Sequence, residues 1–293
     1  MRASLKPMSR VNLFTLHSRS WQANRYVYPV ISRRSRGLSI GVNLNPDKVC
    51  NFDCIYCCVD RTVTPTVREV DLDVLRDELL HMLQLAASGE IWKQPPFDST
   101  PPPLRRINDV AFSGDGEPTA FQKFGEACTL AADLLQQVGL PDVKIVVITN
   151  ATLFHQLRVK RALEFLDERN GEIWAKLDAG TDAYYHLVER TSIPLKRVLD
   201  NVADAGRFRP IVIQSLFMNI QGAGPTDDEI AAYVERLREL VERGCQIKLV
   251  QVYTVARRTA EDYVAPLAPS LIDAIAARVQ ALGLTAEAYY GPT

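Results

Sequence analysis

The sequence predicts an α/β protein built on a parallel β-sheet, and three observations support this prediction. Seven short runs are rich in Val and Ile and are bounded by Gly, Pro, Asn or Asp, which is typical of strands. Segments with helical periodicity lie between them. Alternating strands and helices form parallel sheets, either open or curled into a partial barrel, and ligands bind at the carboxyl ends of the strands. The predicted strands are 38–44, 107–113, 143–149, 172–178, 209–218, 245–253 and 284–289.

The helical segments differ in how clearly they are marked. The clearest covers 226–243, where Thr226 and Glu229 match a capping box and Gly244 follows as a C-cap. A second begins at Ser270 and closes at Gly283. Weaker periodicity predicts helices over 71–86, 120–138, 153–168 and 195–205. Residues 94–106 contain five prolines and are predicted to form a loop or flexible insertion.

Composition excludes several classes of protein. The chain has 293 residues, of which 47% are hydrophobic and 24% charged, as in soluble globular proteins. A net charge of −1 argues against a generic polyanion binder. No apolar run approaches the roughly 20 residues that a membrane span needs, and no secretory leader is evident. We therefore expect a protein with no membrane partner.

The first 46 residues carry eight Arg or Lys and no Asp or Glu. We expect residues 1–36 to form a basic N-terminal arm and residues 37–293 to form one domain. The arm can be read as a solvated leader into the first strand, as a binder of phosphate or RNA, or as a targeting segment. The first two readings are the stronger ones.

Four of the six cysteines lie within Cys50–Cys58, just after the first predicted strand. Cys50, Cys54 and Cys57 follow a C-x3-C-x2-C pattern, and three such thiolates can hold three corners of a cubane iron–sulfur cluster. No fourth cysteine has ferredoxin spacing, so one iron would keep an open position, as catalytic metal sites do. A zinc site or a dithiol pair are the alternatives, but the first lacks nearby histidines and the second leaves Cys50 unexplained. We expect Cys58 to be a spare buried thiol and not a ligand.

This motif, with Tyr56 before its last cysteine, resembles the radical S-adenosylmethionine (SAM) superfamily. The resemblance implies a partial (β/α)6 TIM-like barrel of parallel strands that holds one [4Fe–4S] cluster. Its free iron would chelate SAM, and reductive cleavage would give a 5′-deoxyadenosyl radical that abstracts hydrogen from a substrate. It also places Tyr56 near the adenine of SAM.

The segment 113–119, SGDGEPT, follows the second predicted strand and resembles the superfamily's Gly-Gly-Glu-Pro segment. Paired glycines let the backbone approach a ligand closely. The resemblance implies that Gly114, Gly116 and Glu117 contact the SAM ammonium group. Asp115 departs from that pattern.

Polar residues mark the ends of later strands. Period two in strand 172–178 places Trp174, Lys176 and Asp178 on one face, where burial is costly unless the charges are paired or bind a ligand. We favour contacts with SAM for Lys176 and Asp178 over a purely structural ion pair. Asn150 and Gln214 end or occupy other strands and join the same predicted SAM site. A substrate carboxylate or phosphate could be clamped by an arginine, for which the candidates are Arg190, Arg257 and Arg258.

Several motifs together resemble a branch of compact Fe–S oxidoreductases grouped with tRNA wyosine-type synthases. Since no cysteine precedes Cys50, a second cluster is not expected. The leading hypothesis is a radical SAM enzyme with an unidentified substrate. The alternatives are a radical SAM tRNA-modifying enzyme that uses the basic arm, and a non-catalytic Fe–S electron-transfer or sensing protein; activation of a glycyl-radical partner is a weaker option. The chemistry implies a flavodoxin- or ferredoxin-type electron donor and a reducing cytoplasm.

Overall fold

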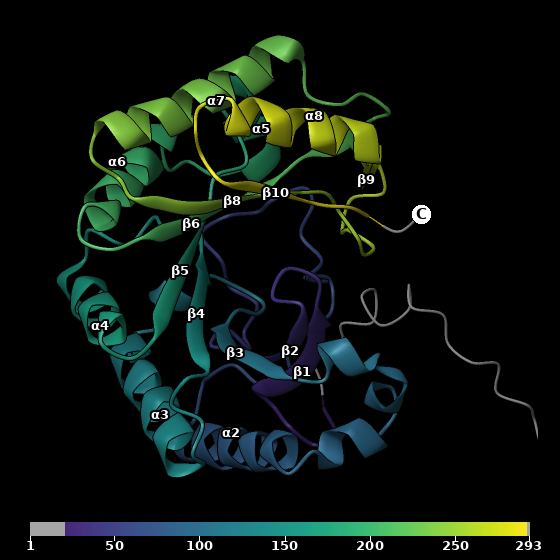
Figure 1. Cartoon of the computed structure of the whole chain (residues 1–293), viewed down its shortest axis with the longest axis vertical. Helices are drawn as coiled ribbons and strands as arrows, with labels where there is room; N and C mark the ends of the chain where they lie inside the picture. Colours follow the sequence, from purple (N-terminus) through teal and green to yellow (C-terminus); the bar gives the residue numbers. More distant parts are fainter. Residues whose placement is uncertain (1–20, 292–293) are drawn as a thin grey trace, which may run out of the picture.

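The computed structural model describes residues 21–291, whose main feature is an eight-stranded sheet in the order β1-β2-β3-β4-β5-β6-β8-β10. In this sheet, β1 pairs antiparallel with β2, and the other neighbouring strands all pair parallel. The sheet curls into a half-barrel with an opening between β1 and β10 (Figure 1). The predicted α/β partial barrel is therefore confirmed. The strands are β1 Val27–Ser32, β2 Gly37–Val42, β3 Ile107–Phe112, β4 Lys144–Thr149, β5 Gly171–Lys176, β6 Ile211–Leu216, β8 Ile247–Tyr253 and β10 Ala286–Tyr289.

Helices cover the outer face of the curled sheet (Figure 1). They are α2 Leu72–Ala87, α3 Phe124–Gln137, α4 Leu157–Asp167, α5 Asp182–Glu189, α6 Leu195–Gly206, α7 Asp227–Glu242 and α8 Pro269–Gln280. A small two-stranded sheet pairs β7 Met218–Ile220 with β9 Val264–Pro266. All six predicted helices are found, whereas the sequence did not predict α5. Within residues 21–291, no helix has the length and apolar character needed to cross a membrane.

The predicted capping box of α7 is only half formed. The Thr226 hydroxyl accepts from the backbone N–H of Glu229 at 3.2 Å, as expected. The Glu229 carboxylate does not return to Thr226. It accepts instead from the backbone N–H of Gly180 at 2.5 Å and from Thr181. This fixes the segment after β5 to the first turn of α7.

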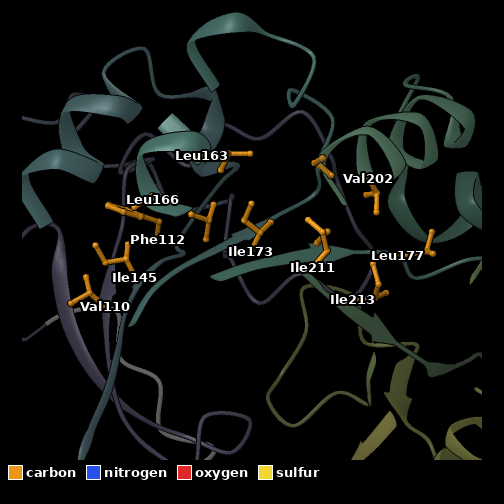
Figure 2. Packing of buried hydrophobic residues seen from close by; sticks show 14 of the residues in the cluster. Val110, Phe112, Ile145, Leu163, Leu166, Ile173, Leu177, Val202, Ile211 and Ile213 are labelled. Atoms are coloured by element: carbon orange, nitrogen blue, oxygen red, sulfur yellow. The ribbon is translucent and has the colours of Figure 1, made fainter. Parts of the chain in front are cut away.

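Side chains alternate between the two faces of each strand, and those on one face pack against the helices. Figure 2 shows side chains of β3, β4, β5 and β6 packed against those of α4 and α6. In β5 and just after it, Ile173, Ala175 and Leu177 belong to this outer core, as the alternation predicted. The other face is directed into the half-barrel, where Ala111, Val146, Trp174 and Val212 form an apolar layer.

Two segments differ from the sequence-based expectation. Strand β1 lies inside the range predicted as a basic arm, so residues 27–32 belong to the sheet. Residues 1–20 of that arm lie outside the described part of the chain. The proline-rich segment is partly ordered as short 3₁₀ turns at Phe97–Ser99 and Pro102–Leu104, and a further such turn at Glu90–Lys93 precedes it. It is not merely a solvated loop, because Phe97 and Thr100 are buried.

Candidate active site

The cysteine loop follows β2 and lies at the carboxyl-terminal edge of the parallel strands. Cys50, Cys54 and Cys57 all line one cavity of about 280 Å³ inside the half-barrel. Most of the predicted SAM-site residues line the same cavity: Tyr56, Gly114, Gly116, Glu117, Asn150, Lys176 and Gln214. Residues from five strands or strand ends therefore converge where the sequence placed the site. Asp178 is the exception, since it is buried behind this surface.

On one side, the cysteine loop is anchored to the end of β4 through Asn51. The Asn150 side-chain amide donates to Asn51 Oδ1 at 2.7 Å, and Asn51 donates in turn to the Thr152 hydroxyl at 2.6 Å. The Thr191 hydroxyl donates to the Asn51 carbonyl at 3.0 Å. Both hydrogen-bonding groups of the Asn150 side chain are thus used within the protein, because its Oδ1 accepts from Thr152. Asn150 therefore positions the loop from the cavity wall, and its contact with SAM stays a prediction.

Glu117 is also committed to internal hydrogen bonds. Its Oε1 accepts from the backbone and hydroxyl of Thr119 and from the Thr149 hydroxyl at 2.6 Å, and its Oε2 accepts from the Asn150 N–H at 2.8 Å. Burial raises the pKa of the Glu117 carboxyl, although these hydrogen bonds oppose the shift. The carboxylate therefore ties the turn after β3 to the end of β4. Contact with the SAM ammonium group would have to use the less occupied Oε2.

Gly114 and Gly116 allow two backbone segments to meet. A Cβ on Gly114 would overlap the side chain of Asn43, and one on Gly116 would overlap the carbonyl oxygen of Val49. Because Asn43 and Val49 belong to the segment that leads from β2 to Cys50, the paired glycines support the cysteine loop. Both glycines also line the cavity, so the predicted close approach to a ligand stays a prediction beside this role within the protein.

On its other side, the loop contacts two buried acids. The Cys54 thiol donates to Glu189 Oε2 at 2.6 Å, and the Tyr56 hydroxyl donates to Asp178 Oδ2 at 2.5 Å. Backbone hydrogen bonds from Asp53 and Ile55 to the end of α5 hold the loop there. Burial, and then the charge of Asp178, raise the pKa of Glu189 well above its ordinary value. The sequence reasoning missed Glu189 because α5 was not predicted.

Lys176 and Asp178 pair with each other, and not with a helix as the structural alternative had it. Their charged atoms lie 3.0 Å apart, and the Asp178 side chain is fully buried. Asp178 Oδ1 also accepts from the backbone N–H of Leu216 at 2.7 Å, so both its oxygens are used by the protein. Lys176 still reaches the cavity, where it donates to the Tyr253 hydroxyl at 2.8 Å. Burial opposes its charge, but Asp178 and its other neighbours raise the pKa of Lys176 overall.

Gln214 has a free acceptor that suits a ligand such as SAM. Its amide donates to Gln251 Oε1 at 2.7 Å, whereas its own Oε1 is buried and lacks a hydrogen-bond partner among the described residues. An unpaired buried carbonyl costs free energy. Because Gln214 lines the cavity, a hydroxyl or amino group of a bound molecule could satisfy it.

The three cavity-lining thiols are the donor type that a cubane iron–sulfur cluster uses. Within residues 21–291, no three His, Cys, Asp or Glu side chains are gathered as one metal ion would require. A [4Fe–4S] cluster needs only one thiolate at each of three corners. Burial raises the pKa of Cys50 to about 11 and that of Cys54 well above its ordinary value. Cluster binding would therefore displace protons from these thiols.

The remaining candidates divide between the cavity and the surface. Cys58 is exposed, so the prediction of a buried thiol is wrong; it also lines the cavity, and its thiol lies 3.8 Å from the Tyr56 carbonyl. Arg190 pairs with Glu261 at 2.5 Å and with Asp53 at 3.6 Å, and is absent from the cavity lining. Arg257 does line the cavity.

Comparison with known proteins places the fold. The chain resembles a radical SAM methyltransferase from Sphaerobacter thermophilus, with a TM-score of 0.62 at 13% identity over 90% of this chain and 69% of that one. The chain has the radical SAM fold. Streptococcus suis SuiB, solved bound to S-adenosylmethionine, shares the radical SAM fold seen here with a TM-score of 0.50 at 13% identity, over 88% of this chain and 49% of SuiB. The resemblance predicted from the cysteine motif is thus confirmed at the level of the fold.

Sequence comparison gives weaker likenesses. No family model matches the chain. The UPF0026 protein of Methanocaldococcus jannaschii is 24% identical over 241 residues, which cover 81% of this chain and 65% of that relative. The chain therefore spans just under two thirds of the length of this relative.

Proposed function

We propose that this chain is a radical SAM enzyme in which Cys50, Cys54 and Cys57 hold one [4Fe–4S] cluster. The observation that supports this most directly is the convergence of the three thiols on one cavity of a radical SAM fold. The cavity also contains Lys176 and the unsatisfied carbonyl of Gln214. A cavity with convergent polar groups at the carboxyl ends of parallel strands is where such folds place their chemistry.

A [4Fe–4S] cluster held by Cys50, Cys54 and Cys57 would, with bound SAM and an electron from a flavodoxin- or ferredoxin-type donor, supply 5′-deoxyadenosyl radical chemistry. In our proposal Gln214 Oε1 accepts a hydrogen bond from SAM, and Tyr56 lies beside it in the cavity. Ala111 and Trp174 of the apolar layer give the cavity an apolar wall beside these polar groups.

Anaerobic reconstitution with iron, sulfide, dithionite and SAM tests this function. We expect 5′-deoxyadenosine to be released by the wild type and to fall to background in Cys54→Ala. Cys58→Ala is the matched control, because it removes an exposed thiol next to the motif and should leave release unchanged. An intact cluster without 5′-deoxyadenosine would reject the enzyme and favour an electron-transfer or sensing protein.

The tRNA-modifying alternative makes a separate prediction. It requires RNA binding by the basic N-terminal residues, of which 1–20 lie outside the described structure. Binding of this kind weakens steeply with salt, because counterions are released from the RNA. A filter-binding assay with a tRNA transcript at two salt concentrations tests it, and no measurable binding at low salt would exclude it.

A further inference from the structure

Residues 254–263, which connect β8 to β9 and are called the closing segment below, lie against the cysteine loop. The backbone N–H of Ala260 donates to the carbonyl oxygen of Cys57 at 2.8 Å. Val255 belongs to the same buried apolar cluster as Tyr56. The cysteine loop is therefore supported by a segment that lies about 200 positions later in the chain.

Arg190, the residue that follows α5, links this closing segment to the cysteine loop. Its Nη1 lies 2.5 Å from Glu261 Oε1 and 3.6 Å from Asp53 Oδ2, and its Nη2 donates to the Tyr263 hydroxyl at 2.5 Å. Arg61, later in the cysteine loop, pairs with the other oxygen of Asp53 at 3.4 Å. One guanidinium thus contacts both segments, because its planar group carries several donors in a fixed geometry.

Both carboxylates of this network stand next to the supports of predicted cluster ligands. Asp53 directly precedes Cys54 in the chain. Glu261 directly follows Ala260, whose N–H holds the carbonyl of Cys57. The guanidinium therefore spans the backbone neighbours of two of the three thiols, and its loss would let them separate.

The backbone of Arg190 gives a second observation. It has φ 45° and ψ 48°, in the left-handed region, where it ends α5. Glycine is the usual residue at such a helix end, since other residues adopt this conformation at a cost in free energy. An arginine here indicates that the side chain makes a contribution that glycine would not. The contacts with the two carboxylates are such a contribution.

We propose that Arg190 is a positioning residue that clamps the closing segment onto the cysteine loop and so holds Cys54 and Cys57 ready for cluster binding. The cluster rests on the proposed function, whereas the clamp concerns the chain alone. From the sequence, Arg190 was a candidate for binding a substrate carboxylate or phosphate, but it binds carboxylates of the protein. Because its side chain is 38% exposed, we expect its loss to open the loop locally without unfolding the chain.

Alkylation of the full chain, purified without iron, tests the clamp, because a thiol reacts when the structure exposes it. Iodoacetamide labelling with tandem mass spectrometry gives a rate for each cysteine. In the wild type, the exposed Cys58 should react first and the buried Cys128 last. We expect Arg190→Gln to raise the labelling rates of Cys54 and Cys57 by about threefold to tenfold, as for a partly exposed charged hydrogen bond. The rates of the two reference thiols should stay unchanged.

Two further variants separate the side chain from the backbone. Arg190→Gly removes the side chain but suits the left-handed backbone, so it should raise labelling without lowering the unfolding temperature. Arg190→Lys keeps the charge but loses the planar group, so it should restore part of the protection.

Arg209→Gln is the matched control, because it removes another arginine ion pair at a distant place. Arg209 lies just before β6, at the amino-terminal end of the sheet, and pairs with Asp167 at 2.7 Å. Its side chain is more buried than that of Arg190. The control should therefore lower the unfolding temperature and leave the labelling of the cysteine loop unchanged.

The reconstituted protein extends the test to the cluster. Transfer of iron to a chelator under anaerobic conditions should be faster in Arg190→Gln than in the wild type by a similar factor of about threefold to tenfold, and unchanged in Arg209→Gln. A wild type that binds no cluster would refute the proposed function, while the labelling of the iron-free chain would still decide the clamp.

Four results would overturn the proposal. Equal labelling of Cys54 and Cys57 in the wild type and in Arg190→Gln would show that there is no clamp. A parallel rise at Cys128 in every Arg190 variant would show a general loss of stability. A rise in Arg190→Gly alone would assign the effect to the backbone. Faster labelling with an unchanged rate of iron transfer would show that the clamp does not serve the cluster.

Discussion

At the amino-terminal end of the half-barrel, the buried acid Glu172 accepts from Trp174 at 2.8 Å and forms ion pairs with Lys144 and Lys248. At the carboxyl-terminal end, two buried acids, Asp178 and Glu189, crowd around Tyr56 and the cysteine loop. Burial acts to raise the pKa of Glu172, but its three donors lower it overall, whereas the pKa of Glu189 is raised.

The contrast indicates that the two ends of the half-barrel have different roles. Charges at the amino-terminal end are compensated within the protein, as expected for a region that stabilises the fold. Charges at the carboxyl-terminal end are crowded by like charges, as is common at functional sites. Variants at the two ends should therefore fail in different ways.

The largest expected difference concerns two glycines. Gly116→Ala places a Cβ against the Val49 carbonyl and should displace the segment leading to Cys50, so most of the bound iron should be lost after reconstitution. Gly171→Ala, at the start of β5, places a Cβ 2.6 Å from Leu166. It should cost about 1–3 kcal/mol of folding free energy by overpacking and leave iron content unchanged. Iron analysis measures the bound iron and thermal unfolding measures the stability of each variant. Equal iron loss in the two variants would refute the proposed difference between the two ends of the half-barrel.

A second comparison uses the acids themselves. Asp178→Asn leaves Lys176 without its carboxylate in a site where the Lys176 side chain is 16% exposed, so unfolding free energy should fall by about 3–5 kcal/mol. Glu172→Gln should cost about 1–2 kcal/mol, because its lysines are half-exposed and regain water. Denaturant unfolding of the two variants in the same buffer ranks them, and the reverse order would contradict the proposed role of burial.

The smallest effect is one of pH. A carboxyl group whose pKa is lowered by folding stabilises the folded state above its unfolded value, which is about 4.3 for Glu. For Glu172 this contribution should be present at neutral pH and should be lost as pH falls below that value. The difference in unfolding free energy between wild type and Glu172→Gln should therefore stay constant from pH 7 to about pH 5 and shrink as pH falls below about 4.3. A difference that grows on acidification would show that Glu172 is not stabilised as an anion.

Local signals in the sequence were enough to predict the sheet and the position of the site. Strong Val and Ile runs gave the seven parallel strands, and the cysteine spacing marked the cavity because it follows a strand end. Strand β1 escaped prediction because the arginines of its turn dominate that segment. Glu189 and the role of Arg190 could not be found from local pattern, since both depend on contacts with residues more than 100 positions away.

The cysteine loop is closed by a segment from late in the chain. The backbone N–H of Ala260 donates to the Cys57 carbonyl at 2.8 Å, and the end of α5 pairs with Asp53 and Ile55. About 200 residues separate Cys57 from Ala260, which takes roughly 10–40 s to synthesise at ordinary translation rates. The thiols therefore emerge from the ribosome well before the contacts that hold them exist. Delivery of iron and sulfide to this chain is then expected to be a post-translational event, and until it occurs the emerging thiols are exposed to oxidation.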